Sequence, residues 1–255
     1  MTRDDLSGIR GLLTDMDGVW FVGDTPLPGA AEALARLRAR NLSLRFVTNT
    51  TTRTAAQLSA KMRAMGLEVP PGEFVTTPVA TARWLRAQGI TSVRLVVADS
   101  VRGVFDGFHE SREPEAVVVG DVGTAFGYDL MQDLFRTLMA GARLVAMHKG
   151  RYWQVEDGLR MDIGAFVAGL EYATGRPATV IGKPSAEMFH AALATIALPA
   201  DEVVMIGDDA DMDVAGAQRA GVRGVLVKTG KYREEMFRRS GVKPDLVLDS
   251  IASLP

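Results

Sequence analysis

The chain has 255 residues, of which 47% are hydrophobic and 24% are charged. This is an ordinary globular composition, and the length suffices for one large core or two smaller domains; we expect two. The 29 basic and 31 acidic residues leave a net charge of −2, so we expect neither a nucleic acid nor an anionic membrane as a partner. The chain has no cysteine, which excludes disulfides, thiolate metal ligands and cysteine nucleophiles.

Two further features bear on location. The first six residues are too acidic and polar for a secretory signal. No apolar run approaches the length needed to span a membrane. We therefore expect a cytoplasmic protein.

The first predicted element is a buried strand within residues 12–19, which ends in Asp15-Met16-Asp17-Gly18. In open α/β sheets, ligands bind outside the carboxyl ends of the strands, so we expect the active site here. With one residue between them, Asp15 and Asp17 can reach the same small volume only where the strand has ended and the backbone turns. Gly18 permits such a turn.

The two carboxylates of this stretch repel each other, and no basic residue lies beside them in the sequence. A cation or a shared proton must therefore stabilise them. Mg²⁺ is the simplest candidate, because it prefers carboxylate and carbonyl oxygens and bridges to substrate phosphate. Taken alone, the tetrapeptide is also consistent with a polar turn after a strand, since Asp and Gly are common turn residues.

The next elements alternate between helix and strand. We expect a helix over residues 30–40, a strand over 44–49 that ends in Thr48-Asn49, and a helix over 54–65 that Gly66 terminates. The order β-α-β-α predicts parallel strands joined by right-handed crossovers.

The middle third of the chain has the pattern of a separate lobe. It contains predicted helices over 80–88 and 129–140 and predicted strands over 93–98, 116–119 and 143–147. Longer polar loops, such as 106–114, and glycine-rich breaks between 120 and 127 distinguish this part from the first.

From residue 179 the chain returns to short units that would complete the first sheet. They comprise 179–184, a helix over 185–197, a strand over 203–206, acidic residues over 208–213, a helix that ends at Ala220, and strands over 224–227 and 246–248. We predict a doubly wound, parallel-sheet (Rossmann-like) α/β core with an inserted α/β cap domain. The predicted limits are 1–78 and 179–255 for the core and 79–178 for the cap.

The predicted strand ends supply the groups that phosphoryl transfer needs. Asp15 would attack phosphorus to give an aspartyl-phosphate, and Asp17 would protonate the leaving oxygen and then activate the hydrolytic water. Thr48 would hold the phosphoryl oxygens, while Lys183 would neutralise the nucleophile and the phosphate together. Asp208 would complete the Mg²⁺ shell. Without the cation and the lysine, these carboxylates would repel a dianionic phosphate strongly.

Four short motifs, in order along the chain, resemble those of the haloacid dehalogenase (HAD) superfamily of Mg²⁺-dependent phosphohydrolases. They are Asp15-Met16-Asp17-Gly18, Thr48-Asn49, Lys183-Pro184 and Gly207-Asp208-Asp209 with Asp213. The insertion between the second and third motifs resembles the class II (αβ-type, class IIA) cap. Segments 49–51, 149–152 and 228–233 look most similar to the phospholysine/phosphohistidine inorganic pyrophosphate phosphatase group and its HAD-like hydrolase domain-containing relatives.

The resemblance implies a set of site residues. The implied metal ligands are four carboxylates: Asp15, Asp17, Asp208 and Asp213. The implied phosphate-binding residues are Thr48, Asn49, Thr50 and Lys183. The place of Asp213 early in a predicted helix also suits an interaction with the helix dipole. Cap surfaces mediate pairing in relatives, so the resemblance is also consistent with a homodimer.

Lys149 and Arg151 belong to the predicted cap, where two interpretations remain open. They would bind the leaving group of the substrate if their loop reaches over the site; otherwise they belong to a solvated loop after a strand. Cap segments of nucleotide and phosphoglycolate phosphatases usually carry an Asn-x-Asp pattern near this position. The sequence from His148 to Arg151 departs from it, which weakens the transfer of those substrates.

We therefore predict a Mg²⁺-dependent phosphatase that cleaves a small phosphorylated molecule, a phosphoric monoester or pyrophosphate, while the cap closes over the site. Two alternatives remain. A phosphotransferase or phosphomutase would pass the aspartyl-phosphate to a second substrate. A receiver-like signalling domain would be phosphorylated without turnover, but it would need neither the inserted lobe nor Asp17 two residues after the acceptor.

Overall fold

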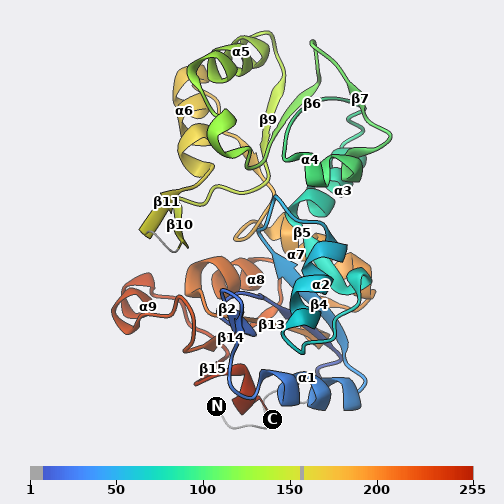
Figure 1. The fold of residues 1–255 in the computed structure, drawn as a ribbon, viewed down its shortest axis with the longest axis vertical. Helices are drawn as coiled ribbons and strands as arrows, with labels where there is room; N and C mark the ends of the chain where they lie inside the picture. Colours follow the sequence, from blue (N-terminus) through green and yellow to red (C-terminus); the bar gives the residue numbers. More distant parts are fainter. Residues whose placement is uncertain (1–7, 156–157, 255) are drawn as a thin grey trace. The chain divides into compact units, whose positions relative to one another are not determined.

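The computed structural model describes residues 8–155 and 158–254, which divide into two compact units (Figure 1). The first unit comprises the described residues of 1–48, 55–75 and 183–255. The second comprises 49–54 and 76–182. Each unit is built around its own parallel sheet.

The sheet of the first unit has the strand order β15-β14-β13-β1-β4-β5. Its strands are, in chain order, β1 (Gly11–Thr14), β4 (Ser43–Thr48), β5 (Phe74–Thr76), β13 (Val203–Gly207), β14 (Arg223–Val227) and β15 (Leu246–Leu248). The strands from β15 to β4 pair in parallel. Because the chain winds outward in both directions from β1 and β13, the predicted doubly wound α/β architecture is confirmed.

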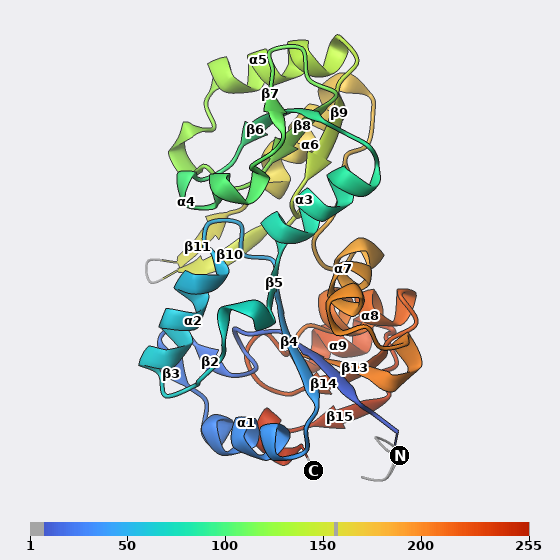
Figure 2. The same cartoon turned by 90° about the vertical axis from the view of Figure 1, so that its right-hand side faces the viewer.

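Helices cover both faces of this sheet (Figure 2). On one side lie α1 (Ala30–Ala39) and α2 (Ala55–Ala64), and on the other lie α7 (Ala186–Ile196) and α8 (Gly216–Arg219). The unit also contains α9 (Glu234–Ser240), the π-helical turn η6 (Ala210–Ala215), the 3₁₀ turns η2 (Pro71–Glu73), η5 (Ala200–Glu202) and η7 (Ile251–Ser253), and a small hairpin of β2 (Phe21–Val22) and β3 (Thr25–Pro26).

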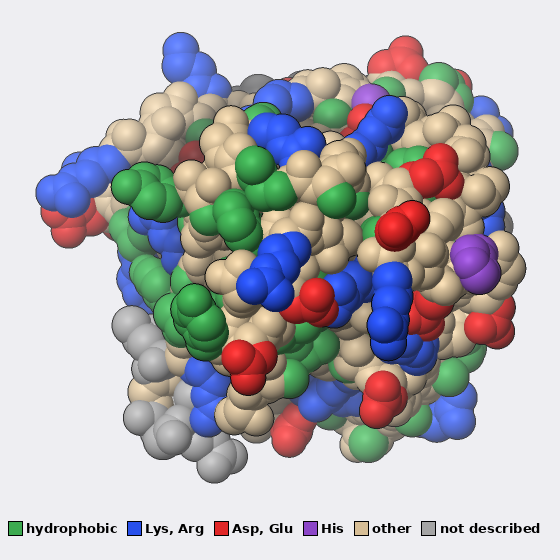
Figure 3. Space-filling model, turned by 90° about the horizontal axis from the view of Figure 1, so that it is seen from above, with side chains coloured by type: hydrophobic (Ala, Val, Ile, Leu, Met, Phe, Trp, Pro, Cys, Tyr) green, Lys and Arg blue, Asp and Glu red, His purple; other side chains and the backbone are tan. Residues whose placement is uncertain are grey.

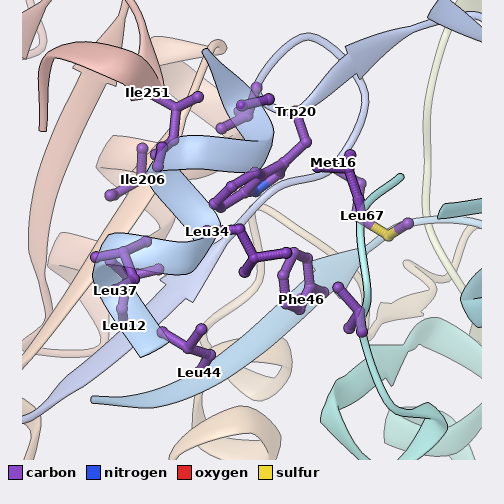
Figure 4. Close-up of a cluster of buried hydrophobic side chains, with 14 of the residues drawn as sticks. Leu12, Met16, Trp20, Leu34, Leu37, Leu44, Phe46, Leu67, Ile206 and Ile251 are labelled. Carbon is purple, nitrogen blue, oxygen red and sulfur yellow. The ribbon is translucent and has the colours of Figure 1, made fainter. Parts of the chain in front are cut away.

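One buried apolar cluster fastens the first helix layer to the sheet (Figure 4). Leu34 and Leu37 of α1 pack toward Leu12 of β1 and Phe46 of β4, all of them buried. The Trp20 ring, which is fully buried, lies 5.6 Å from the Phe46 ring between centroids. This packing holds the loop after β1, which contains both predicted catalytic aspartates, against the core.

The sheet of the second unit has the order β12-β9-β8-β6-β7, with parallel pairs throughout. Its strands are β6 (Ser92–Val96), β7 (His109–Glu110), β8 (Ala116–Val119), β9 (Arg143–Ala146) and β12 (Thr179–Val180). The accompanying helices are α3 (Thr77–Ala87), α4 (Asp99–Arg102), α5 (Tyr128–Met139) and α6 (Gly164–Thr174), with turns η3 (Gly103–Phe105) and η4 (Gly123–Ala125) and a hairpin of β10 (Tyr152–Val155) and β11 (Gly158–Met161).

The two units differ in their bounds from the expected core and cap. Residues 179–182 were expected in the core but group with the second unit, because β12 pairs with β9 and extends that sheet. Residues 49–54 group with it as well. There the Thr77 hydroxyl donates hydrogen bonds to the carbonyl oxygens of Asn49, at 3.3 Å, and Thr50, at 2.9 Å.

Several elements were absent from the sequence prediction or differ from it. Helix α6 was missed because Gly164 and Gly169 interrupt its helical pattern. The helix predicted to end at Ala220 begins as the π-helical turn η6, in which the Val214 amide donates to the carbonyl oxygen of Asp209 at 3.4 Å. Strand β5 is too short for a periodic signal.

Basic and acidic side chains are interspersed on the face shown in Figure 3, without an extended area of one sign. Among the helices of the described residues, none is long and apolar enough to cross a membrane.

Candidate active site

Three strands of the first unit end side by side at the carboxyl edge of the sheet. In the register, Thr14 of β1 lies opposite Phe46 of β4 and Ile206 of β13. Two residues beyond these partners come Thr48 on one side and Asp208 on the other. The backbone amide of Asp15 continues the ladder with a 2.9 Å hydrogen bond to the Ile206 carbonyl. Parallel pairing therefore delivers the predicted aspartates and Thr48 to one edge.

Lys183 is the centre of a buried ion-pair cluster. Its ammonium lies 2.7 Å from Oδ1 of Asp15 and 2.8 Å from Oδ1 of Asp213. Burial alone would lower the pKa of Lys183, but the attraction of Asp15 and Asp213 outweighs it and raises the pKa above its ordinary value. The lysine is therefore firmly charged, and it joins the nucleophile candidate to η6.

The predicted position of Lys183 at a core strand end is wrong. The preceding strand, β12, belongs to the sheet of the second unit, and Lys183 starts the connection into α7 of the first. Helix α7 then begins at Ala186, and the side chain of the preceding Ser185 caps its N-terminus. Lys183 is therefore placed by this connection between the two units' secondary structure, and its ion pairs with Asp15 and Asp213 hold its side chain in the site.

Asp208 is buried and is held by neighbouring backbone. Its Oδ2 accepts a hydrogen bond of 2.7 Å from the amide of Lys231. Gly18 has φ of 85°, and a Cβ there would lie 1.9 Å from the same oxygen. Gly230 has φ of 55°, and its Cβ would lie 2.1 Å from it. Because both residues are glycines and have no Cβ, their backbones can approach Asp208 this closely.

The second carboxylate oxygen of Asp208 differs from the oxygens of Asp213 in its hydrogen bonding. Oδ1 is buried and has no hydrogen-bond partner in residues 8–155 and 158–254. By contrast, Oδ2 of Asp213 accepts from the Asp209 amide at 3.2 Å, and its Oδ1 contacts Lys183. A buried oxygen without a partner costs free energy, so such an atom points to a ligand.

Crowding of carboxylates changes their acidity. Burial, followed by repulsion from Asp15 and Asp213, raises the pKa of Asp208 to about 8. Burial also raises the pKa of Asp213, to about 6, although the Lys183 ammonium opposes this shift. Because both ionised forms are disfavoured in the folded protein, a cation that binds here would be bound in exchange for protons.

Asp17 lies on the loop after β1, outside the cluster of three carboxylates. The residue as a whole is exposed, but its carboxyl group is partly shielded from solvent. This burial and the repulsion from Asp15 raise the pKa of Asp17. The loop is fixed by Trp20, whose Nε1 donates to the Thr14 hydroxyl at 2.8 Å. The same hydroxyl donates to the carbonyl oxygen of Asp15 at 2.8 Å. These bonds position both aspartates.

The other predicted binding residues belong to the second unit. Asn49 and Thr50 follow β4 and lie in the segment grouped with that unit. Lys149 forms an ion pair with Glu171 of α6. Arg151 is exposed, and its carbonyl oxygen accepts from the Asp162 amide at 3.1 Å. The roles assigned to these four residues stay predictions.

Sequence reasoning missed Lys231 as a site residue. Its charge interacts with Asp15, Asp208 and Asp17. Burial lowers the pKa of Lys231, but attraction to Asp15 and Asp208 raises it above its ordinary value. A signal was present, because β14 ends at Val227 beside β13 and the loop that follows must lie at the same carboxyl edge.

The site fits a hard divalent cation. Oxygens of Asp15, Asp208 and Asp213, all buried, lie within 4.8 Å of one another, a cluster found among the residues that the structure describes. The donor set is made of carboxylates, which suits Mg²⁺. Asp208 Oδ1 is the buried oxygen that such an ion would satisfy.

A doubly wound α/β sheet with this carboxylate–lysine cluster at its carboxyl edge defines a HAD-type hydrolase. Two family models match the chain: a haloacid dehalogenase-like hydrolase model over residues 12–109 and a HAD-hydrolase-like model over 180–254. The chain is 38% identical over 253 residues to phospholysine phosphohistidine inorganic pyrophosphate phosphatase of Homo sapiens, covering 97% of this chain and 93% of that protein. It is 43% identical to haloacid dehalogenase-like hydrolase domain-containing protein 2 of Bos taurus, covering 95% and 93%.

Solved structures of phosphatases have the same fold as this chain. The p-nitrophenyl phosphatase from Archaeoglobus fulgidus superposes with a TM-score of 0.90 at 31% identity, covering 96% of this chain and 98% of that chain. The glycerol phosphate phosphatase of Mycobacterium tuberculosis in complex with magnesium has a TM-score of 0.87 at 27% identity, covering 98% and 77%. The chain belongs to the haloacid dehalogenase-like hydrolase family, as the sequence motifs indicated, and it is a phosphatase of that family.

Gly18 offers a test of the close packing around Asp208. Gly18→Ala is expected to lower both stability and phosphatase activity, because a Cβ would overlap Asp208 Oδ2. The matched control is Gly23→Ala, since Gly23 has φ of 62° but open space around its Cβ position. The control reports backbone strain alone, about 1–2 kcal/mol. Denaturant unfolding measures both variants, and equal losses would contradict the packing.

Proposed function

We propose that this protein is a Mg²⁺-dependent phosphohydrolase that cleaves a small phosphorylated substrate through an aspartyl-phosphate at Asp15. The observation that carries the proposal is the buried contact of Asp15 with Lys183 beside the unpartnered oxygen of Asp208. A nucleophile, a fixed cation and an acidic metal site at one sheet edge are the parts that phosphoryl transfer requires.

Asp15 and Asp208 would hold the metal ion. Both oxygens of Asp213 already have protein partners, which favours a role in positioning Lys183. Asp17 was also predicted as a metal ligand, but a carboxyl group that donates a proton is not at the same time an ionised ligand, and the raised pKa of Asp17 favours the acid role. When bound, Mg²⁺ supplies positive charge that reduces the repulsion between these carboxylates and the substrate phosphate.

In the first step, an oxygen of Asp15 attacks phosphorus while the bond from phosphorus to the leaving oxygen breaks. Asp17 donates its proton to that leaving oxygen; its raised pKa supports the acid role. Lys183 orients the attacking carboxylate through its 2.7 Å contact. Thr48, at the end of the neighbouring strand β4, would donate to a phosphoryl oxygen.

In the second step, water attacks the phosphorus of the aspartyl-phosphate. Asp17, now ionised, accepts a proton from this water, and the bond between phosphorus and the Asp15 oxygen breaks. Inorganic phosphate leaves, and both aspartates return to their starting states. Asn49, Thr50, Lys149 and Arg151 stay candidate substrate-binding residues, and a homodimer stays a prediction.

The direct experiment measures phosphate release from phosphomonoesters, nucleotides, sugar phosphates and pyrophosphate, with Mg²⁺ and with a chelator. Release that the chelator abolishes supports the proposal. The relatives named as acting on pyrophosphate, p-nitrophenyl phosphate and glycerol phosphate make these three compounds the first to try. Transfer of the phosphoryl group to an added alcohol or sugar, without free phosphate, would instead favour a phosphotransferase.

Metal binding has a readout that does not need turnover. Saturating Mg²⁺ is expected to raise the unfolding temperature, because binding at 100 times Kd adds about 2.7 kcal/mol to stability. Asp208→Asn should lose most of this increase. The matched control Asp211→Asn, at an exposed aspartate of η6, should keep it. An unchanged increase in Asp208→Asn would contradict the assigned metal site.

A further inference from the structure

Lys231 follows β14 on a segment that is fastened to the loop after β1. Its amide donates to Asp208 Oδ2 at 2.7 Å, and the Thr229 hydroxyl donates to the carbonyl oxygen of Gly18. Between them, Gly230 approaches so closely that its Cβ would lie 2.4 Å from the Gly18 Cα. The backbone that carries Lys231 is therefore placed by the same contacts that hold the proposed metal site.

The ammonium of Lys231 lies close enough to the carboxylates of the reaction centre to interact with their charges. It interacts with Asp15, Asp208 and Asp17 through space. Lys231 makes no ion pair with any residue in the described part of the chain. The residue as a whole is exposed, although its ammonium is partly shielded from solvent. An ammonium so placed remains accessible to an anion from solution.

Two other lysines near the carboxylates differ from Lys231. Lys183 is buried and bound to both Asp15 and Asp213. Lys61, which also interacts with Asp17, forms an ion pair of 3.0 Å with Asp24. Of these three cations, Lys231 is the exposed one beside Asp17, the residue proposed to protonate the leaving group.

A leaving group that carries its own negative charge meets a barrier in this site. It must approach Asp15, whose ionised carboxylate attacks phosphorus and repels an anion. A cation on the leaving-group side removes that repulsion and adds a charge-assisted hydrogen bond. Lys231 can supply this cation, because it is exposed and its charge interacts with Asp15 and Asp17.

We propose that Lys231 binds a second anionic group, a carboxylate or a phosphate, on the leaving-group side of the substrate. The site then prefers substrates whose leaving group carries a negative charge to substrates whose leaving group is uncharged. This inference rests on the proposed phosphohydrolase function and adds its substrate class.

A matched pair of substrates tests the selection. Phosphoglycolate carries a carboxylate, whereas 2-hydroxyethyl phosphate has an uncharged hydroxymethyl group at the same place. Lys231→Gln is expected to reduce the ratio of kcat/KM for phosphoglycolate to that for 2-hydroxyethyl phosphate by about tenfold or more, the effect of one lost ionic contact. Lys231→Arg should restore part of the ratio, because it keeps the charge.

The control is Lys228→Gln, which removes an exposed lysine of the same segment that pairs with Asp249 at 3.7 Å. Its substrate ratio should equal that of the wild type. Pyrophosphate, in which the second anionic group is a phosphate, is compared with 2-hydroxyethyl phosphate in the same way. A loss of selectivity for phosphoglycolate, for pyrophosphate or for both shows which second anion Lys231 binds. A Lys231→Gln ratio unchanged for both anionic substrates, or an equal loss on all substrates, would overturn the inference while leaving phosphohydrolysis intact. A wild type inactive on every compound would instead overturn the proposed function and this inference with it.

Discussion

Asp15→Asn is expected to abolish phosphate release, lowering kcat by at least about 10⁴-fold, as removal of a covalent nucleophile does. The amide has nearly the shape of the carboxylate but is a very poor nucleophile toward phosphorus. It also gives up the ion pair with Lys183 at 2.7 Å. Steady-state phosphate release under saturating Mg²⁺ measures the effect.

The control for Asp15→Asn is Asp211→Asn, which makes the same change at an exposed aspartate. The control should retain the wild-type rate. Circular dichroism on both variants checks that the fold persists. Substantial turnover by folded Asp15→Asn would refute the nucleophile assignment.

Lys183→Met is expected to destabilise the metal-free protein by about 3–5 kcal/mol, the usual cost of removing one partner of a buried ion pair. The substitution leaves Asp15 and Asp213 close together without their shared cation. Both carboxylates can then be neutralised only by protons. The loss should therefore be smaller at low pH and grow as the pH rises.

Urea unfolding at several pH values, in the presence of a chelator, measures this loss. The matched control Lys228→Met removes an exposed lysine and should change stability by no more than about 0.5 kcal/mol. A loss for Lys183→Met as small as that of the control, at neutral pH, would show that the ion-pair cluster contributes little.

The core site could be anticipated because parallel strands bring their carboxyl ends to one edge. An apolar run followed by Asp15, and another followed by Asp208, were enough to predict that the two meet. The same argument, applied to β4, predicted that Thr48 lies at this edge. The contacts made by these residues required the structure, since sequence spacing does not say which oxygen of Asp208 lacks a partner.

Other features depend on contacts that local patterns do not encode. The grouping of residues 179–182 with the second unit follows from pairing with β9, more than thirty residues earlier in the chain. Lys231 was missed because its importance comes from the close approach of Gly230 to Gly18. The cap helix α6 was missed because its glycines weaken the helical signal.

The most direct test of the covalent mechanism is the stereochemistry at phosphorus. A phosphate ester made chiral with sulfur and an oxygen isotope is hydrolysed in water that carries another oxygen isotope, and the configuration of the product is determined. Attack by Asp15 followed by attack by water comprises two in-line displacements, each of which inverts the phosphorus. The account predicts net retention of configuration. Net inversion would mean that water attacks the substrate directly, and it would contradict the aspartyl-phosphate at Asp15.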